Sequence, residues 1–328
     1  MGLANLVPGV SGGTMILSLG LYDRFIAAIA ELTSLRWTRE TLVFMGVLAV
    51  GLFGAILSMS GPAVWLVSEH RWIAYSLFIG LTLGGVPELL KLCKGGLVKV
   101  AASASVGLGL MIWLALSGAR TVEPSLVNLL WVGALAASSM ILPGVSGSLL
   151  LLIFGLYSTV IGSISLLKSQ PVEAIEVLGP VAVGAALGIG VLANVLKRAL
   201  ERAPRVSHGL LLGLLVGSVV GLYPFQESVH PELSKRESRK AVQMLVVDDA
   251  SIEEIEAAYA PGWEAEEVEA LRAEYGGRSA SDLKRLSLEL ERFSPGLQQV
   301  LTALGLLAGG AFLTGLMSRG GRKGTEQP

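Results

Sequence analysis

A proline- and glycine-rich turn interrupts an apolar run near the start of the chain, and the same turn recurs 135 residues later. Residues 6–23 read LVPGVSGGTMILSLGLYD, and residues 141–158 read ILPGVSGSLLLLIFGLYS. Nine of the eighteen aligned positions are identical. Proline and glycine disfavour the interior of a helix, so a repeated turn inside apolar sequence indicates a required break in the backbone.

The composition indicates a membrane protein that crosses the bilayer several times. Only 16% of the 328 residues are charged, whereas a soluble domain carries about 25%. Several apolar runs exceed the roughly 18 residues that predict a transmembrane helix. These runs are 2–22 (broken), 42–67, 72–90, 97–117, 126–142, 147–167, 174–196, 208–224 and 297–318. We therefore predict an all-α polytopic membrane protein.

Lysine and arginine predict the orientation of the chain. They are concentrated in segments 23–41, 91–99 and 197–207 and in the C-terminal tail. Short loops rich in these residues remain in the cytoplasm. The long polar segment 227–294 then falls outside the cell by the parity of crossings. A capping-box pattern at Ser251 and later glycine breaks predict helices there to about Tyr259, over 263–275 and over 281–293.

The two motif copies introduce two halves of opposite topology. A second echo, GLTLG at 80–84 and GLLVG at 213–217, lies at an offset of 133. The charge rule makes segment 72–90 run inward and segment 208–224 run outward. Inverted-topology repeats with broken or re-entrant helices are a transporter architecture, and the breaks mark the binding site. The predicted divisions are repeat 1 (1–117), repeat 2 (118–226), a polar helical insert (227–294), and a final transmembrane helix with a basic cytoplasmic tail (295–328).

Each motif offers a site for an anion. The helix breaks are assigned to Pro8, Gly9, Pro143 and Gly144. The helix after each break begins with unpaired N–H groups and partial positive charge, and neighbouring hydroxyls add donors. The residues predicted to bind a phosphate are Ser11, Gly12, Gly13, Thr14, Ser146, Gly147, Ser148 and Asn5. Gly-rich packing kinks are the structural alternative.

Two charged residues are candidates for contact with the headgroup or for coupling to an ion. Arg24 follows the first motif, where it can instead form an interfacial ion pair with Asp23. Glu88 lies near a membrane boundary, where it can instead cap a helix. The three histidines show no metal-ligand spacing, so no metal and no cofactor is expected.

The motifs MGLANLVPGVSGGTMILSLGLYD and SSMILPGVSGSLLLLIFGLY, with GLYPFQ at 221–226, resemble the bacterial polyprenyl-phosphate transporter family, long labelled a domain of unknown function. The resemblance covers about 1–226 and 297–318. It implies a multi-pass plasma-membrane flippase that returns undecaprenyl phosphate, the lipid carrier of cell-wall synthesis, for reuse. It also implies a lipid substrate, no enzymatic activity and no nucleic-acid partner, while a coupling ion stays open.

Other functions compete with this interpretation. A small inorganic-anion transporter or channel is the nearest, since backbone anion sites do not identify the rest of the ligand. A membrane lipid phosphatase is less favoured, because no histidine lies beside an Arg/Lys cluster within an apolar run. Met1 aligns with Ala136, so the first motif copy has no counterpart of the apolar residues 126–135 that precede the second copy. We expect either a natural start upstream of Met1 or an abbreviated first hairpin.

Overall fold

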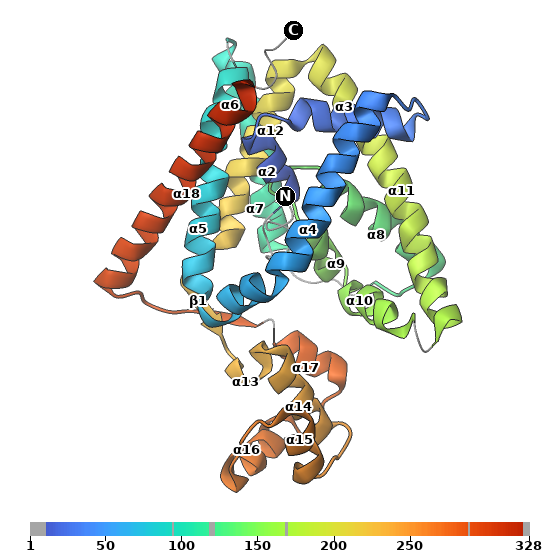
Figure 1. The fold of residues 1–328 in the computed structure, drawn as a ribbon, viewed down its shortest axis with the longest axis vertical. Helices are drawn as coiled ribbons and strands as arrows, with labels where there is room; N and C mark the ends of the chain where they lie inside the picture. The colour runs from blue at the N-terminus through green and yellow to red at the C-terminus, as the bar shows by residue number, and fades with distance from the viewer. Residues whose placement is uncertain (1–10, 94, 118–121, 168–169, 288, 324–328) are drawn as a thin grey trace.

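The structure, a computed structural model, describes residues 11–323 apart from 94, 118–121, 168–169 and 288. Within these residues, six helices are long and apolar enough to cross a membrane. They span Arg39–Met59, Arg71–Leu92, Leu97–Leu116, Pro171–Arg202, Pro204–Leu222 and Leu297–Ser318. The prediction of a mostly helical, multi-pass membrane protein agrees with this architecture (Figure 1).

The elements follow one another along the chain as two groups. The membrane part contains α2 (Gly12–Ser18), α3 (Tyr22–Thr33), α4 (Arg39–Glu69), α5 (Arg71–Leu83), α6 (Val86–Leu92), α7 (Leu97–Leu116), α8 (Leu126–Ser139), α9 (Gly147–Ile153), α10 (Tyr157–Leu166), α11 (Pro171–Arg202), α12 (Pro204–Ser218), the 3-10 helix η1 (Val219–Leu222) and α18 (Leu297–Lys323). The polar part contains β1 (Gln226–Ser228), α13 (Pro231–Ser234), α14 (Arg236–Val246), α15 (Ile252–Tyr259), α16 (Ala265–Tyr275), α17 (Ala280–Leu286) and β2 (Leu290–Arg292).

The main hydrophobic core of the membrane part forms around α2 and α3. Ile16 and Ile26 are buried there against Leu211 and Leu214 of α12. Helix α2 lies in the middle of the helix assembly (Figure 1), where it contacts α3, α5, α6 and α18. The part of the first motif that α2 contains is therefore mostly buried inside the protein.

Glycines let two pairs of long helices approach closely. In the contact of α12 with α7, a Cβ atom built on Gly213 would lie 2.0 Å from the carbonyl oxygen of Ala104. In the contact of α5 with α18, a Cβ atom on Gly80 would lie 2.3 Å from the carbonyl oxygen of Leu307. Only glycine fits at such distances. Close helix packing therefore explains why the glycine-containing sequences at 80–84 and 213–217 are similar.

The basic segments and the polar segment lie at opposite ends of the membrane part. The α6–α7 and α11–α12 connections and the end of α18 gather at one end in Figure 1, and α13–α17 project from the other. The end of α4 lies beside the polar segment, where Lys235 Nζ is 2.6 Å from Glu69 Oε1. This separation is the one expected from the Lys/Arg distribution. Which end faces the cytoplasm stays a prediction.

The polar segment folds around a small core of its own. Its buried residues include Leu233, Val242, Ile255, Tyr275 and Leu283. The short strands β1 and β2 pair antiparallel and join this unit to the membrane part. The segment is thus a helical unit on a two-stranded stalk.

The sequence predictions for this unit are confirmed in part, with one correction and one addition. The capping box at Ser251 and the helix ending at Tyr259 are confirmed. The helix predicted over 281–293 is wrong in its second half, because α17 ends at Leu286 and Leu290–Arg292 pairs as a strand. Helix α14 was not predicted, although its buried residues Ala241, Val242 and Leu245 recur at helical spacing.

The apolar run 147–167, predicted as one helix, is two helices. Helix α9 ends at Ile153 and α10 begins at Tyr157. Gly155 between them has a φ of 71°, a left-handed conformation that favours glycine. Apolar periodicity cannot reveal this break, because the side chains on both sides of the glycine are equally apolar.

Candidate functional site

The two motif turns contact each other directly. Ser11 Oγ donates a hydrogen bond of 3.1 Å to the carbonyl oxygen of Leu142. The backbone N–H of Gly144 donates one of 2.9 Å to Thr14 Oγ1. A Cβ atom on Gly13 would lie 2.8 Å from the carbonyl oxygen of Ile141, so the close approach requires glycine. Segments 130 residues apart in sequence therefore form one polar centre within the apolar core.

The helices that follow the two turns have the same length and the same ending. Helices α2 and α9 each contain seven residues. Each ends before a glycine, Gly20 or Gly155, whose φ is 71° in both cases. Their beginnings differ, because Ser11 Oγ accepts a hydrogen bond from Gly13 N, whereas the Ser146 side chain makes no such capping bond.

The residues predicted to bind a phosphate fall into a buried group and a more exposed group. Ser11 and Thr14 are 4% and 1% exposed, and their hydroxyls join the two turns. Ser148 is exposed and Ser146 half-buried, and their hydroxyl oxygens are 2.8 Å apart. Gly12, Gly13 and Gly147 are buried, and Gly147 packs against the carbonyl of Ala136. In this conformation only the second motif presents hydroxyls at the surface.

The four residues assigned as helix breaks are only partly described. Asn5, Pro8 and Gly9 lie outside the described residues. Gly144 has a φ of 82°, and a Cβ atom there would lie 2.7 Å from the carbonyl oxygen of Leu214. Pro143 lies in the same buried turn. The second turn is therefore a true interruption of the helix, and it packs tightly on α12.

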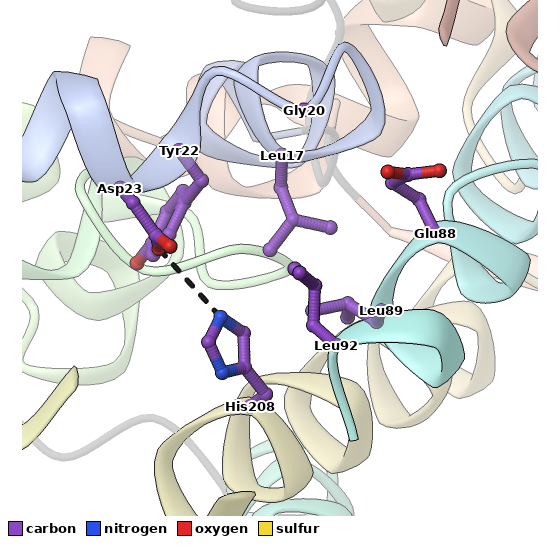
Figure 2. A pocket seen from close by; sticks show the side chains of 8 residues that line it. All are labelled: Leu17, Gly20, Tyr22, Asp23, Glu88, Leu89, Leu92 and His208. Carbon is purple, nitrogen blue, oxygen red and sulfur yellow. Dashed lines mark ion pairs between the residues drawn. The ribbon is translucent and has the colours of Figure 1, made fainter. Parts of the chain in front are cut away.

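A cavity of about 230 Å³ opens at the far end of α2. It is lined by Leu17, Gly20, Tyr22, Asp23, Glu88, Leu89, Leu92 and His208 (Figure 2). Asp23 Oδ1 lies 3.6 Å from His208 Nε2, and His208 Nδ1 lies 2.7 Å from the carbonyl oxygen of Pro204. A cavity with two carboxylates and an imidazole suits the binding or passage of a cation or proton better than that of an anion.

The two charged candidates, Glu88 and Arg24, lie in different surroundings. Glu88 lines this cavity, is 7% exposed, and has its Oε2 3.2 Å from Lys91 Nζ. Arg24 points elsewhere, with its guanidinium 4.6 Å from the centre of the Phe44 ring. Asp23 faces His208 and not Arg24, so the expected Asp23–Arg24 pair is replaced by an Asp23–His208 pair.

Sequence reasoning missed two members of this region. His208 was set aside because the three histidines are scattered, and spacing along the chain does not reveal that α12 packs near α3. Tyr22 is buried and its hydroxyl donates to the carbonyl oxygen of Ile141 at 3.2 Å. Its signal was available, since Gly-Leu-Tyr recurs in both motif copies.

Comparison with known proteins supports the resemblance found in the motifs. Two relatives, each named polyprenyl-phosphate transporter, come from Vibrio cholerae and Staphylococcus aureus. The first is 33% identical over 180 residues, which is 50% of this chain and 57% of the relative. The second is 32% identical over 206 residues, which is 59% of this chain and 70% of the relative. The match thus spans little more than half of the Vibrio protein.

No solved structure matches this chain. A family model, described as undecaprenyl phosphate translocase-like, matches residues 1–240, which include both motifs and all elements from α2 to α14 except the last turns of α14. The chain belongs to the undecaprenyl phosphate translocase-like family.

Proposed function

We propose that this protein moves a polyprenyl phosphate, of the undecaprenyl phosphate class, across the bacterial plasma membrane without breaking a chemical bond. The observation that carries the proposal is the family match over residues 1–240, which spans both motif turns and the cavity beside them. The two relatives named as polyprenyl-phosphate transporters support the same substrate class. An amphiphile with an anionic headgroup fits a polar centre inside an apolar helix assembly.

The transport mechanism in this proposal is alternating access between two inverted repeats. Helices α4 and α11 contain 31 and 32 residues, and both carry a Gly-x-x-Ala-Val-Gly sequence, at 46–51 and 179–184. Helix α5 starts at the end of the membrane part that bears the polar segment, and α12 finishes there. The matching glycine contacts of α5 and α12 add support. The hinge would then lie where the two motif turns touch.

The headgroup site in this proposal centres on the second motif. Ser146 and Ser148 offer hydroxyls, and the backbone N–H groups of 147–149 lie at the start of α9. Hydrogen bonds to a charged group contribute roughly 1.5–3 kcal/mol each. Rocking of the repeats would release Ser11 and Thr14 from the opposite turn, and these hydroxyls would then hold the phosphate in the alternate state. Asn5 would assist from the preceding segment.

The isoprenoid tail would remain in the lipid. Keeping tens of apolar carbons in the bilayer avoids burying them in a protein of this size. The headgroup would then move along the polar centre while the tail follows through the bilayer. The proposal also places the protein in the plasma membrane, where return of the carrier lipid would serve cell-wall synthesis.

A proton is the coupling ion in this proposal. Glu88, Asp23 and His208 line one cavity beside the first motif, and Glu88 is nearly buried. Carboxylates and histidines within membrane segments serve as proton relays. Entry of a proton at Glu88 would lower the negative charge next to α2 when the phosphate approaches.

The test is reconstitution in liposomes containing undecaprenyl phosphate, with a side-specific probe of the headgroup. The wild type should move the lipid, and the Ser146→Ala, Ser148→Ala double variant should move it several times more slowly. Ser105→Ala is the matched control, because Ser105 is an exposed serine of α7 that bonds only its own helix. Movement of inorganic phosphate but not of the lipid would favour the small-anion transporter. Release of phosphate from the lipid would favour a phosphatase.

A further inference from the structure

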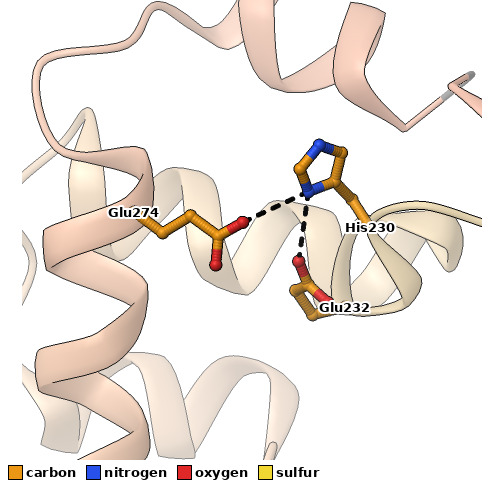
Figure 3. Close-up of side chains that lie close together, drawn as sticks. All are labelled: His230, Glu232 and Glu274. Atoms are coloured by element: carbon orange, nitrogen blue, oxygen red, sulfur yellow. Dashed lines mark ion pairs between the residues drawn. The ribbon is translucent and has the colours of Figure 1, made fainter.

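Three side chains of the polar segment converge on one point outside the membrane part. His230 follows β1, Glu232 lies in α13 and Glu274 lies near the end of α16. His230 Nδ1 is 3.6 Å from Glu232 Oε1 and 3.4 Å from Glu274 Oε1. All three ligand atoms lie within 4.8 Å of one another. Figure 3 shows both carboxylates directed at the same ring nitrogen.

This spacing is that of ligands around one small ion. Zinc bonds are about 2.0–2.1 Å to histidine nitrogen and about 2.0–2.2 Å to carboxylate oxygen, in tetrahedral geometry. Two donors on one tetrahedral zinc ion are then roughly 3.4 Å apart. The two His230 distances, 3.6 and 3.4 Å, are close to this value. One imidazole with two carboxylates is also a donor set of the kind that zinc sites use.

A tyrosine hydroxyl connects two of the three side chains. The Tyr275 hydroxyl lies 2.7 Å from His230 Nδ1 and also donates to Glu232 Oε1. Two adjacent carboxylates also repel each other unless a positive charge lies between them.

We propose that His230, Glu232 and Glu274 form a binding site for a divalent transition-metal ion, with Zn²⁺ as its representative. Water would complete the coordination, because the Glu274 side chain is 55% exposed. Tyr275 is a positioning residue that holds Glu232 as an outer-shell donor. Calcium fits less well, because it takes six to eight oxygen ligands. The bound ion would join α13 to α16 beside β1, and so stiffen the unit where it leaves the membrane part.

The experiment is a Zn²⁺ titration of the full-length, chelator-treated protein in detergent, followed by calorimetry. The wild type should bind one ion per chain. Glu274→Gln and Glu232→Gln should each weaken binding by at least tenfold, because even the loss of an outer-shell partner costs roughly 10–100-fold. Glu269→Gln, which changes an exposed glutamate of the same helix α16, should bind as the wild type does.

Two further readouts separate loss of a ligand from loss of the fold. Without metal, Glu274→Gln should unfold at the wild-type temperature, because an exposed carboxylate is replaced by an amide of the same shape. Added Zn²⁺ should raise the unfolding temperature of the wild type and not of this variant. Bound Co²⁺ should show a visible absorption spectrum that changes in His230→Ala. Unchanged Zn²⁺ affinity in Glu274→Gln, no binding at micromolar Zn²⁺, or binding of Ca²⁺ in its place overturns the proposal.

Discussion

Thr14 Oγ1 accepts a hydrogen bond of 2.9 Å from the backbone N–H of Gly144, a residue 130 positions further along the chain. Both residues are buried, Thr14 at 1% exposure. The bond joins the first turn of α2, in the first motif, to the Pro-Gly turn of the second motif. In the proposed mechanism, a relative movement of the two motif turns has to break or rearrange this contact, so the contact would affect both stability and transport.

Replacing Thr14 with valine should destabilise the protein. Valine keeps the branched shape but removes the acceptor, and a buried N–H group left without a partner costs about 1–3 kcal/mol. Thr14→Ser keeps the hydroxyl and is the matched control. The measurement is thermal unfolding in detergent, together with the liposome assay of lipid movement. Equal unfolding temperatures for the valine and serine variants would show that this bond contributes nothing.

Replacing either of two glycines of α7 with alanine should have opposite effects on the stability of the protein. A Cβ atom on Gly107 would lie 2.4 Å from the carbonyl oxygen of Leu210 in α12, whereas Gly109 has nothing within 4 Å. Gly107→Ala should force the helices apart and cost about 1–3 kcal/mol, as overpacking typically does. Gly109→Ala should be neutral or slightly stabilising, since alanine favours helix. Unfolding in detergent distinguishes the two, and a Gly107→Ala protein as stable as wild type contradicts the packing described here.

The sequence predicted the membrane class and the family, but the geometry of the site only in part. The repeated turn was visible because proline and glycine stand out in apolar sequence. That Ser11 and Thr14 bond the opposite turn was not, since a hydroxyl suited to a phosphate is equally suited to a carbonyl or an N–H group. Pairings such as Asp23 with His208 depend on how α3 and α12 pack, which no local pattern encodes.

A similar limit applies to the polar segment. The histidines were judged by their spacing, and by that measure they showed no metal site. His230 and Glu232 are two residues apart, but Glu274 comes close only because α14 packs against both α13 and α16. A ligand set drawn from separate helices leaves no fixed interval in the sequence.

Removing the carboxylate of Glu88 should change the pH dependence of transport. If this buried group carries the coupling proton, Glu88→Gln cannot gain or lose it. We expect slow lipid movement that no longer varies with a pH gradient across the liposome. Glu40→Gln is the control, because Glu40 is an exposed glutamate of the first turn of α4. A Glu88→Gln protein with a wild-type response to the gradient removes Glu88 from the coupling path.

The polar segment should be accessible from outside the cell. Ser251 is exposed and caps α15, a helix at the end of the molecule opposite the basic connections. In a Cys93→Ala background, Ser251→Cys should react with a membrane-impermeant thiol reagent added to intact cells. Cysteine at exposed Arg202, at the basic end of α11, should react only after the cells are opened. The reverse pattern would invert the topology.

The polar segment should also be dispensable for lipid binding. Its core is separate from that of the membrane part, and the two are joined by the β1–β2 pair. The backbone N–H of Val229 donates a 3.1 Å hydrogen bond to the carbonyl oxygen of Glu289, so these two residues already stand side by side.

An Asn-Gly turn in place of residues 230–288 would therefore close the stalk as a hairpin without moving the membrane helices. The deletion removes the Lys235–Glu69 ion pair and the contact of Lys284 with the Tyr157 ring, which lies 5.2 Å away. An exposed ion pair contributes only about 0–1 kcal/mol, so the membrane part should stay folded. Binding of undecaprenyl phosphate in detergent should match that of the intact protein, and Zn²⁺ binding should disappear. If the shortened protein keeps its helical content and unfolding temperature but loses the lipid, the polar segment belongs to the lipid site, and the boundary drawn here at β1 and β2 is in the wrong place.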